Sequence, residues 1–311
     1  MAITIQQIKE LREATAAGMG ACKEALTATN GNMEEAVKYL REKGLAVAAK
    51  RVDKESKQGI VALAAADDGK SMALAEVNCE TDFVAKNDEF KKFVTAVAKQ
   101  ALKTDAADID AFLGETWNED GSKTVKEALV DKIATIGENL SIRRFKKVSA
   151  DGGALVSYIH GGGRIAVLVK AEADGSDDKV KEALSNIAMQ IAALNPKYIS
   201  DGDIEQSYIE HETEIIRAQI ENDPKEAAKP DKVKEGMIKG RINKQMKEVC
   251  LLDQVYVKAE DGKQNVAKYL EQVGKDNGTT VTLSEFVRFE TGEGMEKKEE
   301  NFAEEVAKQM Q

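Results

Sequence analysis

An acid and an aromatic side chain stand next to each other in the stretch Glu80–Asn87, which reads Glu-Thr-Asp-Phe-Val-Ala-Lys-Asn. Asp82 offers a negative charge and Phe83 a bulky apolar wedge at one point, and a loop between packed elements is where proteins commonly place functional groups. The same residues also fit a structural role, in which Asp82 or Asn87 caps the following helix and Phe83 fills the core. The exposure of Phe83 in the folded protein distinguishes the two interpretations.

The residue types that bind metals or perform covalent catalysis are scarce and widely separated. The cysteines are Cys22, Cys79 and Cys250, and the histidines are His160 and His211. No Cys-x-x-Cys or His-x-x-x-His spacing occurs, and so few histidines leave little material for a hydrolase triad. We therefore expect no metal site, no cofactor and three reduced thiols, with the cysteine at position 79 the most exposed.

Two glycine-rich stretches imitate nucleotide-binding motifs. Gly69-Lys70-Ser71 matches the end of a P-loop, but Ala64 stands where that motif has its first glycine, and a strand rather than a helix follows. The pattern Gly161-x-Gly163-x-x-Ala166 imitates a dinucleotide fingerprint, but it joins two strands and opens no helix that could bind phosphate. The sequence therefore predicts no direct nucleotide binding.

Charge and hydropathy exclude other classes of partner. The 311 residues carry a net charge of -10 and a mean hydropathy of -0.42, which fit a soluble folded chain of two or three domains. The densest basic run, 143–147, alternates as a strand with one solvated face does, so nucleic-acid binding is not expected. No apolar run reaches the roughly 18 residues that span a bilayer, and Met1–Gln7 lacks the features of a secretory signal. We expect a cytoplasmic protein with a protein partner and no membrane contact.

Apolar spacing predicts an α+β protein made of five segments. The first is a three-helix module, the second and third are halves of an α+β core with antiparallel strands, and the fifth is a C-terminal helix. The fourth contains two polar helices with thin apolar stripes, so it should protrude as a helical hairpin. The expected boundaries are 1–54, 55–150, 151–200 together with 250–290, 201–249 and 291–311.

The two core halves repeat one pattern of elements. Residues 59–64 and 72–77 read as strands joined by an Asp-Gly turn, and residues 154–160 and 164–169 as strands joined by three glycines. Each hairpin precedes a helix and, later, another strand, which indicates an internal duplication. The remaining expected elements are strands over 140–148, 251–257 and 281–289 and helices over 90–101, 125–136, 180–191 and 266–273.

Signature sequences of a known family occur along the chain. The run Glu76–Ala85 resembles one signature of the bacterial elongation factor Ts family almost residue for residue, and Ile8–Leu26 resembles its N-terminal signature. The likeness covers essentially the whole chain. It continues at Asn30–Gly44, His160–Gly162, Arg164–Ile165, Ala188–Ala193 and Phe289–Gly294.

This resemblance implies an architecture and an activity. The family has a ubiquitin-associated-like (UBA-like) three-helix module, a two-subdomain core, a coiled-coil hairpin and a C-terminal helix. Its activity is guanine-nucleotide exchange on the translational GTPase elongation factor Tu, without covalent chemistry. The likeness places four residues near the magnesium site of that GTPase, namely Thr81, Asp82, Phe83 and Val84. Phe83 would act as a wedge, and Asp82 would disturb the groups that hold Mg²⁺, which eases release of GDP. Asn87 then caps the next helix, which leaves Asp82 and Phe83 to point outward.

The resemblance also implies contacts with the same partner elsewhere, at Arg12, Met19, His160 and Phe302. Arg12 and Met19 also fit a plain helix-ending turn, and His160 fits a plain turn residue. The hairpin of 201–249 resembles a dimerisation element, so any homodimer is expected there. The chain departs from the family's usual residues at Ala16, Gly20, Ala21, Ala166 and Gln190, and looks longer than compact members at 105–122 and 274–282.

Two other classes of function fit parts of the sequence. A structural scaffold would use the three-helix module and the hairpin for assembly. An enzyme would use Asp82 or a nearby glutamate as general acid or base, but no second catalytic partner lies within sequence reach. Acceleration of GDP release from elongation factor Tu would separate an exchange factor from both.

Overall fold

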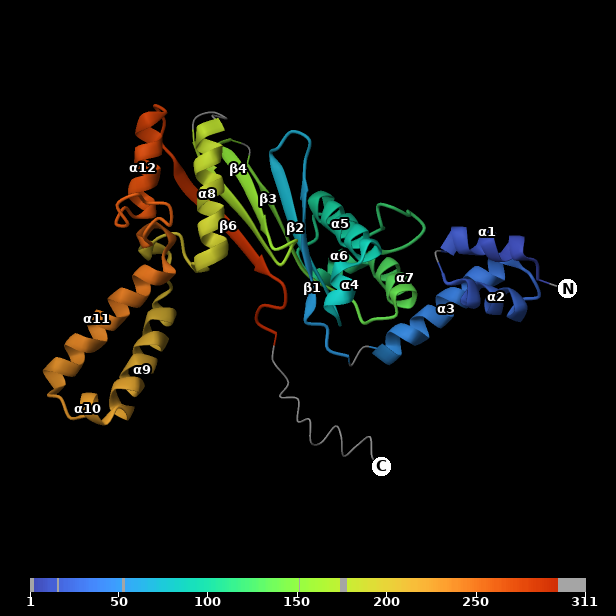
Figure 1. Cartoon of the computed structure of the whole chain (residues 1–311), viewed down its shortest axis with the longest axis horizontal. Coiled ribbons are helices and arrows are strands. Elements are labelled where there is room, and N and C mark those ends of the chain that lie inside the picture. Colours follow the sequence, from blue (N-terminus) through green and yellow to red (C-terminus); the bar gives the residue numbers. More distant parts are fainter. Residues whose placement is uncertain (1–2, 16, 52–53, 151, 174–177, 296–311) are drawn as a thin grey trace.

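Two three-stranded antiparallel sheets form the centre of the fold (Figure 1). The computed structural model describes residues 3–15, 17–51, 54–150, 152–173 and 178–295. The first sheet contains, in spatial order, β1 (Gln58–Ala65), β2 (Ser71–Cys79) and β3 (Ser141–Ser149). The second contains β4 (Ala154–His160), β5 (Ile165–Glu172) and β6 (Thr282–Glu290). The predicted α+β class is confirmed.

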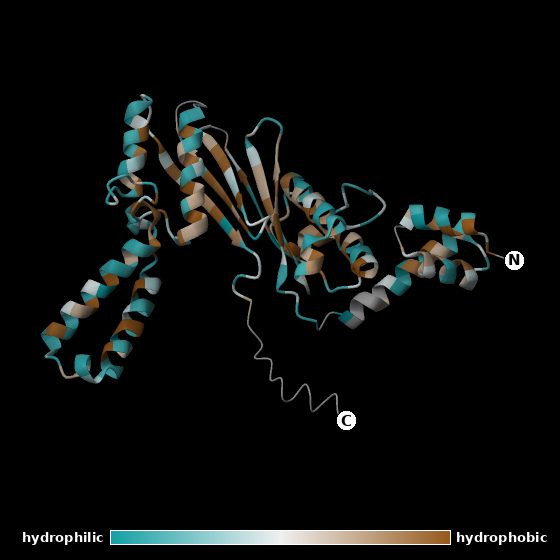
Figure 2. Cartoon of the chain, in the orientation of Figure 1, coloured by the Kyte–Doolittle hydropathy of each residue, from teal (hydrophilic) through white to brown (hydrophobic). Residues whose placement is uncertain are grey.

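Each sheet packs against the other sheet through one face and against a helix through its other face. The helix α5 (Asp88–Lys103) covers the first sheet, and α8 (Asp178–Leu194) covers the second. Because both faces are covered, the central strands β2 and β5 are almost continuously buried and hydrophobic (Figure 2). The cluster between the sheets contains Val61, Leu74, Val148, Leu155, Leu168 and Phe289.

The expected duplication is visible in the backbone. Gly59 and Gly153 each lie at the start of a hairpin with positive φ, at 144° and 82°. A Cβ atom at Gly59 would lie 2.2 Å from the carbonyl oxygen of Val77, and one at Gly153 would lie 2.2 Å from that of Ala171. The central strands also shift register at matching places, immediately before these two partner residues. Both halves therefore share one glycine requirement and one strand irregularity.

The helices before the core form the expected three-helix module. They are α1 (Ile5–Thr15), α2 (Met19–Ala28) and α3 (Met33–Arg51). The side chain of Asn32 accepts a hydrogen bond from the backbone N–H of Glu35 at 3.2 Å, so it caps α3. The helix α3 then packs against α7 (Val125–Ile136), where a Cβ on Gly44 would come 3.2 Å from that of Ala134.

The helical hairpin stands away from the sheets, as its polar composition predicts (Figure 1). It consists of α9 (Gln206–Asn222), α10 (Pro224–Ala227) and α11 (Asp231–Val249). Only Ile216 and Ile220 of α9 are buried, and no residue of α11 is. The remaining helices are α4 (Asp82–Lys86), α6 (Ile109–Gly114) and α12 (Val266–Asp276), with short 3-10 turns η1 (Asp201–Asp203) and η2 (Leu251–Asp253).

The strand predicted over 251–257 is wrong. The segment begins as η2, and the backbone N–H of Leu251 donates to the carbonyl of Tyr198 rather than to a strand partner. Leu251 and Tyr256 are nonetheless buried, while Val255 and Val257 are exposed. The apolar pattern therefore reflects burial under a turn. Among the described residues this segment forms one isolated bridge, between Val255 and Asn265, and no ladder with a strand.

Two further expectations, the C-terminal helix and the contact residue Phe302, fall on residues that the structure does not describe. The C-terminal helix expected over 291–311 lies outside the described residues beyond Met295, and so does Phe302. Within the part of the chain that the structure describes, no helix combines the length and apolar character needed to cross a membrane.

A buried carboxylate joins the two sheets. Glu76 of β2 is fully buried and pairs with Arg143 at 3.1 Å and with Arg144 at 2.5 Å, both on β3. It also accepts a hydrogen bond from the backbone N–H of Gly292, just after β6, at 2.8 Å. The guanidinium of Arg144 lies 4.2 Å from the ring centre of Phe289. The interpretation of these arginines as a solvated strand face is therefore wrong.

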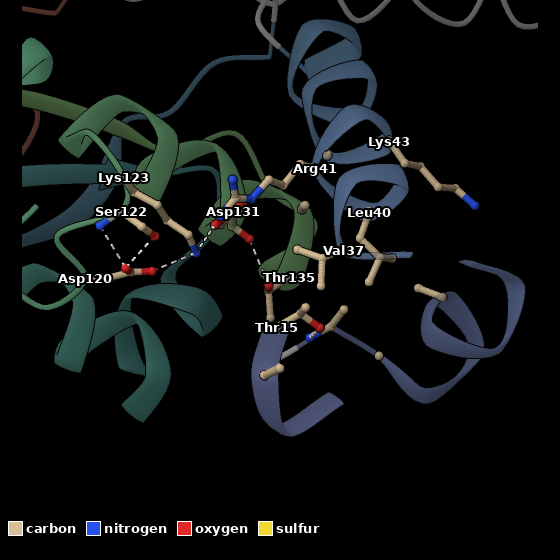
Figure 3. Close-up of a pocket in the computed structure, with 16 residues that line it drawn as sticks. Thr15, Val37, Leu40, Arg41, Lys43, Asp120, Ser122, Lys123, Asp131 and Thr135 are labelled. Carbon is tan, nitrogen blue, oxygen red and sulfur yellow. Dashed lines mark hydrogen bonds and ion pairs between the residues drawn. The ribbon is translucent and has the colours of Figure 1, made fainter. Parts of the chain in front are cut away.

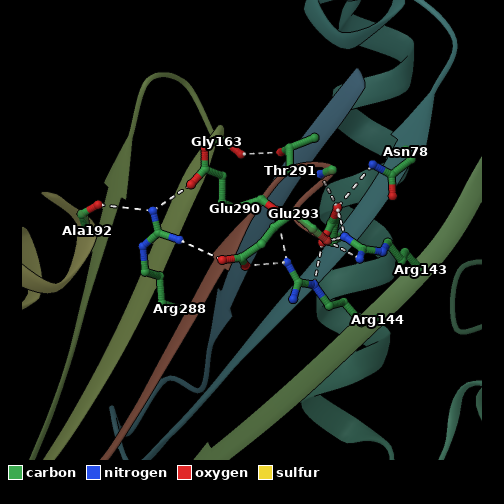
Figure 4. A network of polar contacts seen from close by, with 11 residues as sticks. Asn78, Arg143, Arg144, Gly163, Ala192, Arg288, Glu290, Thr291 and Glu293 are labelled. Carbon is green, nitrogen blue, oxygen red and sulfur yellow. Dashed lines mark hydrogen bonds and ion pairs between the residues drawn. The ribbon is translucent and has the colours of Figure 1, made fainter. Parts of the chain in front are cut away.

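The same network continues along the second sheet (Figure 4). Arg144 donates to the carbonyl oxygen of Glu290 at 3.0 Å, and Arg288 pairs with the Glu290 carboxylate at 2.7 Å. Glu293 pairs with Arg144 at 3.4 Å and Arg288 at 3.3 Å. Charged hydrogen bonds thus connect β2, β3 and β6 across the boundary between the core halves.

Replacing Glu76 by Ala should lower the free energy of unfolding by about 3–5 kcal/mol, because it leaves two partly buried guanidinium groups without their carboxylate. Denaturant-induced unfolding measures this loss. The control is Glu285→Ala, which removes an exposed carboxylate 3.8 Å from Lys146 and should cost less than about 1 kcal/mol. Equal effects of the two substitutions would show that the buried network does not stabilise the fold.

Candidate functional site

The Thr-Asp-Phe-Val segment forms a separate, very short helix between β2 and α5. This helix, α4, has five residues, and Thr81 caps it by accepting a hydrogen bond from the backbone N–H of Val84 at 3.3 Å. Asn87 caps α5, accepting from the N–H groups of Glu89 at 2.8 Å and Phe90 at 3.4 Å. The prediction that Asn87 caps the long helix is confirmed. The additional cap at Thr81 was missed, because five residues are too few to show helical periodicity.

Phe83 is 80% exposed, and no other large apolar side chain among the described residues is more exposed. The helix is attached to the core by its other residues, since Val84 and Ala85 pack against the cluster under α5. Because these two residues face the core, the phenyl ring of Phe83 is left in contact with water. The interpretation of Phe83 as a core residue is therefore wrong, and the one in which it is presented to a partner is consistent with the structure.

Asp82 is exposed, but it is not free. Its carboxylate lies 2.6 Å from the ammonium group of Lys86, one helical turn further on. The hydrogen bond from Lys86 lowers the pKa of Asp82 below its ordinary value of 3.8. Asp82 therefore carries its negative charge at neutral pH, with one neighbouring cation that a partner must displace or accommodate.

Cys79 supports the base of α4. The thiol donates a hydrogen bond to the carbonyl oxygen of Thr81 at 3.2 Å, and burial raises its pKa to about 12. The expectation that Cys79 is the most exposed thiol is wrong, because it ends a central strand covered by α5 and is fully buried. Cys22 and Cys250 are buried as well, and all three thiols are free.

The other expected contact residues lie on two different parts of the molecule. Arg12 on α1 and Met19 at the start of α2 are exposed on the N-terminal module. His160 is exposed at the end of β4, with a ring nitrogen 3.1 Å from the hydroxyl of Tyr158. The turn that follows is bonded to the first sheet, since Val61 of β1 donates its N–H to the carbonyl of Gly163 at 2.7 Å.

The core thus brings two of the expected contact regions to the same strand. The helix α4 contacts β1 and β2, and the turn after His160 is hydrogen-bonded to β1. The N-terminal module with Arg12 and Met19 is a separate body of helices beyond α7 (Figure 1). A partner that touches all of these residues must therefore reach from the core to the N-terminal module.

A hollow of about 370 Å³ lies between the N-terminal module and α7 (Figure 3). Val37 and Leu40 of α3 line one side of it. On the other side Lys123 pairs with Asp131 at 2.7 Å and Asp120 at 3.4 Å, so its charge is already compensated. None of the residues that line this hollow belongs to α4. We interpret it as the seam between module and core.

The described residues offer little for binding a metal ion, because nowhere among them do three or more His, Cys, Asp or Glu side chains come together in a suitable group. The site instead consists of an exposed aromatic ring and a charged pair on a short helix above a buried strand. These features define an α+β protein with a surface suited to binding another protein.

Comparison with known proteins narrows this class. The family model described as elongation factor TS matches residues 80–293, which include the whole of α4. The elongation factor Ts of Clostridium perfringens (strain 13 / Type A) is 49% identical, with 98% of each chain covered. That of Clostridioides difficile (strain 630) is 50% identical, with 99% of each chain covered. The chain belongs to the elongation factor Ts family.

Replacing Lys86 by Ala should raise the pKa of Asp82 back towards 3.8, because the hydrogen bond from the ammonium group is the largest cause of its depression. An NMR titration of the carboxyl carbon measures this shift. Since the pKa in the folded protein is below its ordinary value, the pair stabilises the fold above about pH 3.8 and loses that effect as the pH falls further. Lys92→Ala, on α5, is the control and should leave the titration of Asp82 unchanged. An unaltered Asp82 titration in the Lys86 variant would contradict the pairing.

Proposed function

We propose that this chain is a guanine-nucleotide exchange factor for the translational GTPase elongation factor Tu. Membership of the elongation factor Ts family supports the general activity. The single observation that supports the site is the 80% exposure of Phe83 on a helix that is otherwise attached to the core. In this proposal the chain acts by binding the GTPase alone, performs no covalent chemistry, and itself binds neither nucleotide nor Mg²⁺.

The segment from Thr81 to Val84 enters the GTPase domain beside the magnesium site. Phe83 acts as a wedge there, and burying such a side chain stabilises the complex by about 1.5–3 kcal/mol. Asp82 introduces a negative charge close to the groups that hold Mg²⁺. When the cation is lost, the negative charge of the GDP phosphates is less well compensated, so the nucleotide dissociates more easily.

Binding of factor and nucleotide are reciprocally coupled, so each weakens the other's affinity by the same factor. A tenfold change in affinity corresponds to about 1.4 kcal/mol. If all the free energy from burying Phe83 opposed GDP binding, it would weaken the nucleotide roughly tenfold to a hundredfold. This sets the size of effect to look for when the ring is removed.

Further contacts complete the proposed interface. Arg12, Met19 and His160 are exposed and available to the partner, and Phe302, outside the described residues, is proposed to contact the GTPase domain too. Any homodimer would form through the hairpin of 201–249. The division into five segments, with the boundaries deduced from the sequence, belongs to the same proposal.

Replacing Phe83 by Ala should reduce stimulated GDP release at least tenfold, because the wedge is lost, and should leave the free energy of unfolding nearly unchanged, because the ring is exposed. Release of labelled GDP from elongation factor Tu measures the rate. Val257→Ala removes another exposed apolar side chain, 52% exposed on the core, and should have no effect on release.

Two results would overturn this proposal at different levels. If the unaltered protein does not accelerate GDP release, the exchange function is wrong. If a variant with both Asp82→Ala and Phe83→Ala exchanges at the full rate, the function stands but α4 is not the element that performs it.

A further inference from the structure

The position of α4 cannot be set by the helix itself. It has five residues, none of them buried, and a helix so short is unstable in isolation. The direction in which Phe83 points must therefore be fixed by contacts with the core, namely the packing of Val84 and Ala85 and the contacts at the point where α4 leaves the core. That point is the pair of residues Glu80 and Thr81, between β2 and α4.

One carboxylate from a distant part of the chain holds this point. Glu138 lies between α7 and β3 and is only partly exposed. It accepts hydrogen bonds from the backbone N–H groups of Glu80 and Thr81, both at 3.1 Å, and from the hydroxyl of Thr81 at 2.6 Å. Three donors on two consecutive residues thus converge on one side chain, and hydrogen bonds to an ionised acceptor are stronger than neutral ones.

The hydroxyl of Thr81 transmits this constraint to the helix. It donates to Glu138 and at the same time accepts from the N–H of Val84 in the first turn of α4. Only a side chain that both donates and accepts can make these two bonds, which at position 81 means a hydroxyl group. A continuous path of hydrogen bonds therefore runs from Glu138 to the residue after Phe83.

The arrangement is reciprocal. The carboxylate of Glu80 accepts from the backbone N–H of Asn139 at 2.6 Å, so each loop supplies a carboxylate to the backbone of the other. Arg51, the last residue of α3, donates to the Glu80 carboxylate at 3.0 Å. We call this group of contacts between Arg51, Glu80–Thr81 and Glu138–Asn139 the Glu80–Glu138 clasp.

The clasp also holds the chain that arrives from the N-terminal module. The side-chain amide of Asn139 donates to the carbonyl of Lys54 at 2.7 Å, and the hydroxyl of Ser56 donates to the carbonyl of Asn139 at 3.0 Å. The segment before β1 is therefore tied to the same loop that holds the base of α4.

We propose that Glu138 is a positioning residue for nucleotide exchange, which acts through Thr81 to set the direction of α4 and thereby of Phe83. This inference rests on the proposed exchange function. Glu138 touches neither nucleotide nor metal in this scheme. Its effect falls on the step in which Phe83 enters the partner, while the remaining interface still forms the complex.

Glu138→Ala removes three hydrogen bonds and should lower the maximal rate of GDP release about three- to tenfold, if the cost to the entry of Phe83 equals that of one hydrogen bond of ordinary net strength. The Michaelis constant for the GDP-bound GTPase should change less than about twofold, because the other contacts remain. Glu138→Gln keeps an oxygen that can accept from both backbone N–H groups, so this variant should retain most of the rate of GDP release that Glu138→Ala loses. Glu260→Ala, an exposed carboxylate elsewhere, is the control and should exchange normally.

A second measurement does not depend on exchange activity. Amide hydrogen exchange should become faster in Glu138→Ala at Ala85 and Asn87, whose N–H groups make the backbone bonds of α4. In a background with both Asp82→Ala and Phe83→Ala, Glu138→Ala should cause no additional loss in the rate of GDP release, because it acts only through the direction of α4, which carries both residues.

The outcomes separate the inference from the proposed function. If Phe83→Ala releases GDP at the normal rate, the role of Phe83 in exchange is wrong, and the amide measurement still decides whether Glu138 holds the helix. If Phe83→Ala is slow while Glu138→Ala matches the unaltered protein in both measurements, the positioning inference is overturned. If Glu138→Ala does not fold, Glu138→Asp replaces it, since a side chain one methylene shorter withdraws the carboxylate from its three donors. Faster amide exchange at Ala85 and Asn87 together with slower GDP release in that variant supports the inference, and unaltered values of both overturn it.

Discussion

The pairing of the buried Glu76 carboxylate with two arginines is the interaction on which the arrangement of the core depends. The apolar faces of the two sheets would tolerate small sliding movements, because the hydrophobic effect has no direction. Charged hydrogen bonds do have a direction, and those of Glu76 reach both β3 and the backbone after β6. A displacement of one sheet against the other would leave charges unpaired in a dry interior, which is costly. The network therefore fixes one relative position of the two halves.

This fixed core explains how a single exposed ring can be held in a useful direction. The strand β2 carries Glu76 and is buried over its last seven residues, and α4 starts only three residues after it ends. The short helix thus begins from the most rigid part of the molecule. One exposed phenyl ring is too small a patch to cause aggregation by itself, so the free protein tolerates Phe83 in water.

The sequence predicts the elements that depend on local pattern and fails where distant residues decide. The hairpins and the long helices follow from periodicity and turn residues, whereas the choice of Asn87 over Asp82 as the cap follows from the resemblance to the elongation factor Ts family. The burial of Cys79 follows from neither, because nothing local to β2 shows that it is the central strand of its sheet and lies under α5. The same limitation produced the incorrect strand over 251–257, where apolar residues match the pattern but the part of the chain that the structure describes pairs with them only through the isolated bridge between Val255 and Asn265.

The candidate site contains both kinds of feature, those that a local pattern reveals and those that distant residues determine. The likeness to the elongation factor Ts family directs attention to Asp82 and Phe83, whereas the chemistry of these two residues alone is equally compatible with a cap and a core residue. Glu138 has no signal in the sequence at all, because its partners lie 57 and 58 positions away along the chain. Long-range hydrogen bonds of this kind become visible only in the folded protein.

The matching glycines at positions 59 and 153 also have an evolutionary meaning. In both halves of the core the backbone approaches the neighbouring strand so closely that no Cβ atom fits. Side chains elsewhere have diverged, to the extent that the buried acid Glu76 corresponds to Lys170 at the same point before the register shift. A backbone requirement of this kind cannot drift by conservative replacement, since no other residue is a conservative replacement for glycine there. The likeness of the two halves is therefore preserved in main-chain geometry, although it is nearly absent from the side chains.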